Sequence, residues 1–148
     1  MKIDLTGTKF IANEEGLVLT AYQCSAGVWT IGLGSTYYAN GKKVQKGDKL
    51  PSIAAAYELF ALTVQNYEVA VNNGVKVPLN QNQFNALLSL VYNIGVAGFL
   101  SSTVLKRINA KASFDDVAEA WRRWNKVKGV ENAVLKARRN RELKLYAA

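Results

Sequence analysis

Three side chains near the N-terminus carry groups that can move protons or orient a water molecule. Glu15 supplies a carboxyl group, Cys24 a thiol and Thr30 a hydroxyl, with eight residues between the first two and five between the last two. A protonated carboxyl group can act as a general acid, whereas a thiolate or a hydroxyl can accept a proton from water or align it. These residue types therefore favour general acid–base catalysis as the chemistry of this stretch.

The local sequence predicts how these three groups are positioned. Gly16 directly follows Glu15 and suits the positive φ of a helix C-cap, so Glu15 is expected at the end of a helix. Two runs rich in β-branched and aromatic residues flank Ser25-Ala26-Gly27, which is the pattern of a β-hairpin. We therefore expect a carboxyl group, a thiol and a hydroxyl to meet where a helix end joins a small sheet.

The rest of the chain is mostly helical in pattern. The apolar spacing and the capping signals predict a helix from about 4 to 15 capped by Thr6 or Thr8, a loop from Tyr38 to Lys49, and a helix that starts at Pro51 and closes at Asn73-Gly74. The next helix is apolar on all sides; it is capped by Asn80 with Gln83 and broken by Gly95 and Gly98. Short helices are then expected from Ser101 or Ser102 and from Ser113, and a last helix over 131–146. We predict an α+β fold in one domain, 1–148. In it, a small β-containing lobe (16–50) is joined by a long helix to a larger helical lobe, with 1–15 and 51–148 helical.

Composition excludes several classes of protein. The chain of 148 residues is 49% hydrophobic and 20% charged, which is typical of a folded globule. It has no apolar run of 18 residues and no signal-like N-terminus, so neither a transmembrane segment nor secretion by a leader is expected. A single cysteine and the absence of histidine argue against an intramolecular disulfide and against a metal site. No cofactor or metal is expected.

Positive charge gathers in the C-terminal third. The net charge is +8, and the residues from Thr103 onward include 12 Lys/Arg against 5 Asp/Glu. Such a surface attracts nucleic acid, anionic lipid or acidic cell-wall polymers. A solvated basic face that aids solubility explains the same pattern. Trp121 and Trp124 lie three apart in a helical pattern, so we interpret them as core residues and expect no nucleic-acid partner.

Three blocks of this sequence resemble phage-type lysozymes, the endolysins that cut bacterial peptidoglycan. The first is the Glu15, Cys24 and Thr30 spacing, in which the family carries Asp or Cys at the middle position. The second runs from Val77 to Gly95, and the third is Arg138-Arg139-Asn140-Arg141-Glu142-Leu143. The resemblance implies a lysozyme-like fold and hydrolysis of the β-1,4 bond between N-acetylmuramic acid and N-acetylglucosamine.

The resemblance also implies roles for individual residues. Glu15 would be the general acid, with a pKa raised by partial burial, while the adjacent Glu14 faces solvent. Cys24 and Thr30 would lie on the opposite side of the sugar and orient the attacking water; a small buried hydrophobe is the other interpretation of Cys24. Positions expected to line the cleft are Leu33, Tyr92, Asn93 and Ser102. Arg138 and Arg139 would bring a guanidinium near Glu15, or would simply form a basic helix surface.

The sequence departs from the family's pattern at one position, and two alternative functions fit the same residues. Ser35 stands where many relatives have histidine, so at most a neutral hydrogen bond is expected there. A lytic transglycosylase would use Glu15 alone on the same bond, and a non-catalytic basic protein that binds the wall or membrane would need no acid. As an endolysin, the chain is expected to be a monomer that stays in the host cytoplasm until lysis. It would reach the peptidoglycan of the periplasm through a separate holin and also bind anionic envelope polymers.

Overall fold

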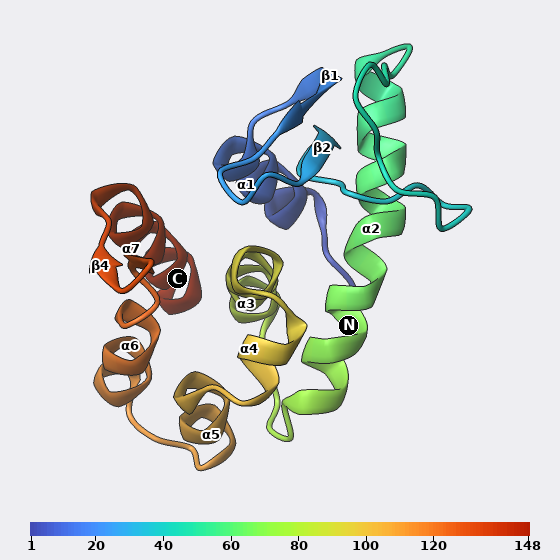
Figure 1. Ribbon diagram of the computed structural model, residues 1–148. Coiled ribbons are helices and arrows are strands. Elements are labelled where there is room, and N and C mark those ends of the chain that lie inside the picture. The colour runs from blue at the N-terminus through green and yellow to red at the C-terminus, as the bar shows by residue number, and fades with distance from the viewer. The chain divides into compact units, whose positions relative to one another are not determined.

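The computed structural model describes residues 1–148, which form two compact units (Figure 1). One unit combines Met1–Gly7 with Tyr67–Ala148, and the other is Thr8–Asn66. The predicted α+β class is confirmed, with helices and two small antiparallel sheets. The elements are α1 (Leu5–Glu15), β1 (Val18–Gln23), β2 (Trp29–Gly32), α2 (Ile53–Gly74), α3 (Gln81–Ile94), α4 (Val96–Leu100), α5 (Thr103–Asn109), α6 (Phe114–Arg122), β3 (Lys126–Val127), β4 (Val130–Glu131) and α7 (Ala133–Ala147). None of the helices has the length and apolar character needed to cross a membrane.

The smaller unit contains the predicted hairpin. Strands β1 and β2 pair antiparallel, with Tyr22 opposite Thr30 in the register. The turn closes where the Gly27 N–H donates to the Cys24 carbonyl at 2.8 Å, and Gly27 has a φ of 77°, which glycine adopts without steric cost. Beneath the hairpin is a small apolar cluster that includes Ile31 of β2, Val44 of the loop and Leu59 of α2. The loop from Tyr38 to Lys49 is thus anchored by a buried valine.

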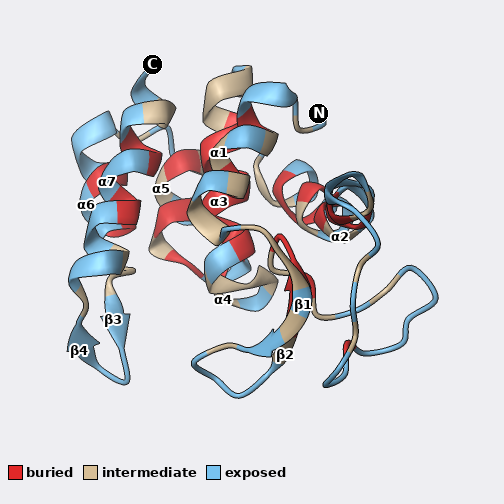
Figure 2. Ribbon diagram, turned by 90° about the horizontal axis from the view of Figure 1, so that it is seen from above, coloured by how far each residue is buried: buried red, intermediate tan, exposed pale blue.

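Helix α3 forms the centre of the larger unit. Nine successive residues, from Phe84 to Tyr92, are buried, which confirms the prediction from its all-round apolar pattern (Figure 2). The predicted capping box is also present. The Asn80 side chain accepts from the Gln83 N–H at 2.8 Å, and the Gln83 side chain accepts from the Asn80 N–H at 2.9 Å. This helix packs against α4 and α7.

The starts of the other helices test the capping predictions. Ser102 caps α5 and Ser113 caps α6, as expected. The predicted cap of α1 and the predicted start of α2 are wrong. The Asp4 carboxylate accepts from the Gly7 N–H at 2.9 Å and the Ser52 hydroxyl accepts from the Ala55 N–H at 3.1 Å, so each helix starts one residue after its capping side chain. Thr6 therefore lies inside α1, and Pro51 precedes the cap of α2.

One further prediction fails at a glycine of the larger unit. Gly95, with a φ of 91°, does end α3, but Gly98 lies inside α4. A Cβ at position 98 would lie 3.3 Å from the Trp124 ring, so glycine there serves close packing rather than a chain break. Residues 126–131 form the β3–β4 hairpin, for which the sequence analysis predicted no strand.

Candidate active site

Cys24 and Thr30 lie together on the β1–β2 hairpin. The Cys24 N–H donates to the Val28 carbonyl at 3.0 Å, and the Thr30 hydroxyl donates to the same carbonyl, also at 3.0 Å. The Thr30 residue is only 5% exposed, whereas Cys24 is partly exposed. The hairpin therefore brings the thiol and the hydroxyl to one place, with the thiol on the solvent side.

The surroundings of Cys24 favour its thiolate. Hydrogen bonds from the backbone at Val28 and then at Ala26 lower the pKa of the thiol, burial opposes them, and the Thr30 hydroxyl adds to the lowering. Hydrogen bonds to a thiolate stabilise the charged form, which is the form that acts as a base or nucleophile. This environment suits a reactive thiol better than an inert core cysteine.

Tyr22 is a residue of this site that the sequence did not single out. It is the cross-strand partner of Thr30, and partners in an antiparallel pair direct their side chains to the same face. Partial burial raises the pKa of the Tyr22 phenol, and the negative charges of Glu15 and Cys24 raise it further. The position of Tyr22 two residues before Cys24 in an alternating strand was the signal that could have identified it.

Glu15 lies at the end of α1, as predicted. It is the last residue of the helix, and Gly16 follows with a φ of 72°. Glu15 is partly buried, and so is the neighbouring Glu14, which was expected to face solvent. The end of α1 and the hairpin that carries Tyr22 and Cys24 belong to the same compact unit.

Two other positions of the smaller unit that the sequence analysis discussed, Leu33 and Ser35, are buried. Leu33 is fully buried, so it presents no surface to a ligand in this conformation. Ser35 is also fully buried, and its hydroxyl lies 2.9 Å from that of Thr63. Because the Thr63 hydroxyl donates to the Leu59 carbonyl, Ser35 is the donor between them. This is the neutral hydrogen bond expected in place of a histidine contact.

The remaining predicted binding positions belong to the larger unit. The Tyr92 ring is mostly buried and packs 4.9 Å from the Tyr67 ring, centroid to centroid. Asn93 is exposed. The Ser102 hydroxyl donates to the Phe99 carbonyl at 2.6 Å and also lines a hollow of about 350 Å³ together with Arg123 and Trp124. Trp121 and Trp124 were both expected in the core; Trp121 is fully buried, whereas Trp124 is only partly buried.

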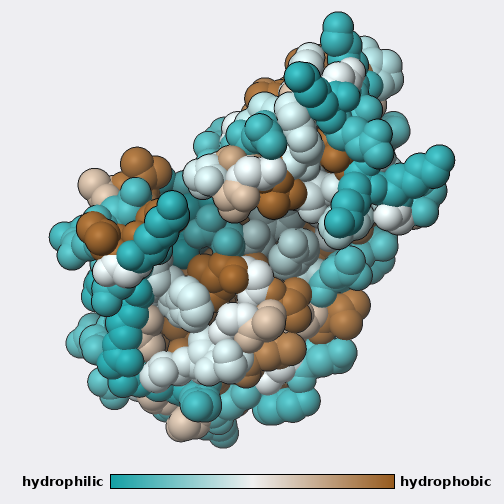
Figure 3. All heavy atoms as spheres, in the orientation of Figure 1, coloured by the Kyte–Doolittle hydropathy of each residue, from teal (hydrophilic) through white to brown (hydrophobic).

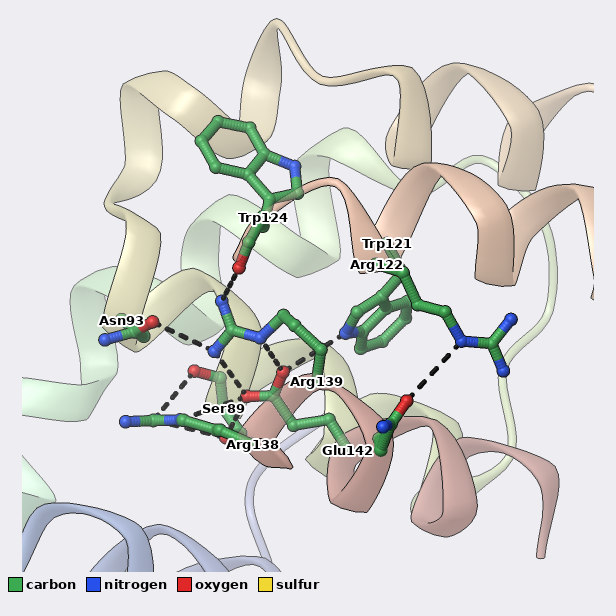
Figure 4. Close-up of polar contacts among 9 residues, drawn as sticks. Ser89, Asn93, Trp121, Arg122, Trp124, Arg138, Arg139 and Glu142 are labelled. Carbon is green, nitrogen blue, oxygen red and sulfur yellow. Dashed lines mark hydrogen bonds and ion pairs between the residues drawn. The ribbon is translucent and has the colours of Figure 1, made fainter. Parts of the chain in front are cut away.

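Arg138 and Arg139 converge on one buried carboxylate, that of Glu142 (Figure 4). Arg139 Nε lies 2.7 Å from Glu142 Oε1, and Arg138 Nε lies 3.3 Å from Oε2. Arg139 is 1% exposed and Arg138 is 6% exposed, so the two do not form a basic helix surface. Glu142, a residue given no role from the sequence, could have been found from its spacing of three and four residues after the two arginines.

Other donors complete the shell of Glu142. The Ser89 hydroxyl donates to Oε2 at 2.5 Å, and the Trp121 indole N–H donates to Oε1 at 3.1 Å. Arg139 also donates to the exposed Asn93 side chain at 2.9 Å, which ties a predicted binding residue to the buried cluster. The cluster holds α3, α6 and α7 together through charge-assisted hydrogen bonds.

Known proteins resemble this chain over nearly its whole length. The family model described as phage lysozyme matches residues 12–142. The endolysin of Salmonella phage P22 is 39% identical over 146 residues, which cover 99% of this chain and 98% of that protein. The structure of the endolysin from Escherichia coli O157:H7 phage FAHEc1 matches with a TM-score of 0.90 at 40% identity, covering 99% of this chain and 93% of that one. The muramidase domain of SpmX from Asticaccaulis excentricus matches with a TM-score of 0.87 at 33% identity, covering 99% and 98%. This chain therefore belongs to the phage lysozyme family.

Proposed function

We propose that this chain is an endolysin that hydrolyses the β-1,4 bond between N-acetylmuramic acid and N-acetylglucosamine in bacterial peptidoglycan. Membership of the phage lysozyme family supports the substrate and the reaction class. The observation that carries the assignment of residues is the β1–β2 hairpin, which brings Cys24 and Thr30 together in the same compact unit as Glu15 at the end of α1. A proton donor and a water-activating group thus lie within one compact unit.

In the proposed reaction, Glu15 and water act on opposite sides of the sugar. Protonated Glu15 transfers its proton to the bridging oxygen, and the bond from that oxygen to C1 breaks with its electron pair going to the oxygen. The oxygen of a water molecule bonds to C1, and one proton of that water passes to the Cys24 thiolate. The enzyme is restored when the thiol releases a proton to solvent and the Glu15 carboxylate takes one up.

Thr30 has a defined part in this scheme because its hydroxyl carries a single proton. In the structure that proton is donated to the Val28 carbonyl. When Cys24 is a thiolate, the hydroxyl can turn to donate to sulfur, and its lone pairs then face outward to accept a hydrogen bond from water. Thr30 would thereby stabilise the thiolate and align the water in one rotation about a single bond.

Residues of the larger unit complete the proposal. Asn93 and Ser102 would bind the glycan, with the Trp124 ring beside Ser102 as an apolar surface for a sugar. Tyr92 would add a ring edge, and Leu33 stays a predicted binding position although its burial argues against direct contact. The orientation of Glu15 by Arg138 or Arg139 stays a prediction. Chain 1–148 would act as a single lysozyme domain.

The central test compares Glu15→Gln with the wild type on purified peptidoglycan. Glutamine keeps the shape of the side chain but cannot donate a carboxylic proton, so clearing of the suspension should be lost. Glu14→Gln is the matched control, because it removes the adjacent carboxylate and should leave clearing intact. Unchanged clearing by Glu15→Gln would overturn the assignment and point to a non-catalytic mode of action.

Mass spectrometry of the released fragments separates hydrolysis from transglycosylation. Hydrolysis adds the elements of water and leaves reducing muramic acid ends, whereas a transglycosylase leaves an anhydro sugar. Cys24→Ser and Thr30→Val then test the water-activating pair. If thiolate chemistry contributes, Cys24→Ser loses most of its rate; full activity in that variant would leave Thr30 as the residue that aligns water.

The cellular setting follows from the same proposal. The enzyme would accumulate as a monomer in the host cytoplasm, cross to the cell wall through a holin, and bind anionic envelope polymers with its basic C-terminal third. Expression in Escherichia coli with and without a holin, followed by culture turbidity, tests this route. Lysis without a holin would contradict it.

A further inference from the structure

The β3–β4 hairpin, residues 126–131, presents apolar side chains to solvent. All six of its residues are exposed, and Figure 2 shows the hairpin in pale blue throughout. Val127 and Val130 are cross-strand partners next to the turn and are 45% and 69% exposed. Val134, in the first turn of α7, is 74% exposed. Figure 3 shows hydrophobic spheres among hydrophilic ones over β4 and the start of α7.

Positive charge surrounds these valines. Lys126 precedes Val127, and Lys128 occupies the tip between the two valines. The one carboxylate of the hairpin, Glu131, lies 3.4 Å from the Lys136 ammonium group, so its charge is already matched from α7. Lys126 and Lys128 have no ion-pair partner and keep their full charge for an external anion.

The backbone at the tip is unusual. Lys128 has a φ of 50° and Gly129 a φ of 79°, which together make a type I′ turn. Asn, Asp or Gly normally occupies the first of these positions, because a lysine with positive φ costs about 1 kcal/mol. A long cationic side chain is therefore held at the tip although a neutral residue would fit the turn better.

We propose that the β3–β4 hairpin is a docking site for a membrane surface rich in anionic phospholipid. The valines beside the turn would enter the boundary between head groups and acyl chains, and the lysines would reach back to the phosphate groups. This activity is independent of the glycosidase site, because none of Glu15, Cys24 or Thr30 takes part in it.

Two other occupants fit the surface less well. A hydrated anionic polymer such as nucleic acid or a polyphosphate would use the lysines but leave the exposed valine pair without a function. A second copy of the chain would oppose two lysines with two lysines, and six residues are far fewer than the roughly 20–30 per partner in a stable interface. An anionic bilayer offers both a negative charge and an apolar layer at one surface.

The test is co-flotation of the protein with vesicles of equimolar phosphatidylglycerol and phosphatidylcholine, against vesicles of phosphatidylcholine alone. Wild type should float with the anionic vesicles at low salt. The variant K126Q/K128N removes both charges and places Asn where the turn prefers it. It should bind about thirtyfold more weakly, since each lysine near an anionic surface contributes roughly a factor of five. The variant V127T/V130T keeps β-branching and should bind about tenfold more weakly.

The matched control is K42Q/K43Q, which removes two exposed lysines from the loop of the smaller unit, far from the hairpin in sequence. It should float like wild type, and no variant should melt at a lower temperature than wild type. Equal loss in the control would show that diffuse charge drives binding and would overturn the proposal. Full binding by V127T/V130T would also overturn it, in favour of a purely electrostatic partner. Concentration-dependent dimers lost in the hairpin variants would assign the surface to a second copy.

Discussion

Replacing Glu142 with glutamine should strongly destabilise the larger unit. The carboxylate is fully buried and faces two guanidinium groups, with Arg139 Nε 2.7 Å from Oε1 and Arg138 Nε 3.3 Å from Oε2. Glutamine fills the same volume, so no cavity forms and the change isolates the charge. It leaves two buried cations without their shared counter-charge. It also brings an amide N–H₂ toward the hydrogen-bond donors of Ser89 or Trp121.

The size of the effect follows from this burial. Removing one partner of a buried ion pair costs about 3–5 kcal/mol, because the remaining charge stays desolvated. That is a large part of the roughly 5–15 kcal/mol by which a domain is stable. For a chain of this size, we expect a fall in melting temperature of roughly 10–15 °C.

Circular dichroism during heating, with urea unfolding at constant temperature, measures the effect. Glu119→Gln is the matched control, because Glu119 also binds two arginines, Arg107 and Arg123, but its side chain is 55% exposed. Water screens that surface cluster, so its loss should barely change the melting temperature. The double variant Glu142→Gln/Arg139→Gln should regain part of the stability. If Glu142→Gln melts no lower than Glu119→Gln, the buried cluster does not stabilise the fold and the reasoning fails.

Three further predictions concern single sites. Because hydrogen bonds from Val28 and Ala26 lower the pKa of Cys24, alkylation by iodoacetamide should reach half its maximal rate at a lower pH in the folded protein than in urea; equal midpoints would contradict this. Burial and the hydrogen bond to Asp48 raise the pKa of Tyr38 to about 12, so its protonated form stabilises the fold fully below the ordinary tyrosine pKa near 10. That stability is lost as the pH rises through about 12, and the advantage of wild type over Tyr38→Phe in urea unfolding should shrink across this range rather than stay constant. Gly7→Ala should lower the melting temperature although alanine favours helices, because its Cβ would lie 2.5 Å from Oδ1 of the buried Asn85; a stabilised variant would show that Asn85 can move away.

The sequence by itself determined the features that depend on neighbours a few residues apart. The capping box of Asn80 and Gln83 and the end of α1 at Glu15 and Gly16 all appeared where the local pattern placed them. The hairpin that unites Cys24 with Thr30 is local too, because its turn spans only the residues between them. These elements form from contacts within one turn of chain, so their signals are written in consecutive residues.

Only the tertiary structure decided the features that need partners far along the chain. The sequence analysis did not identify Asp4 as the cap of α1. Its carboxylate also accepts a hydrogen bond from the Asn85 side chain, 81 residues away, and this partner cannot be read from the residues around position 4. Leu33 was expected to line a cleft but is fully buried. The sequence could not distinguish these locations, because a leucine suits a core and a cleft wall equally well. Ser89 and Glu142 meet across 53 residues inside a low-dielectric interior. Burial and charge pairing at such separations depend on how whole helices pack, and periodicity along one helix carries no record of which side chain will face it.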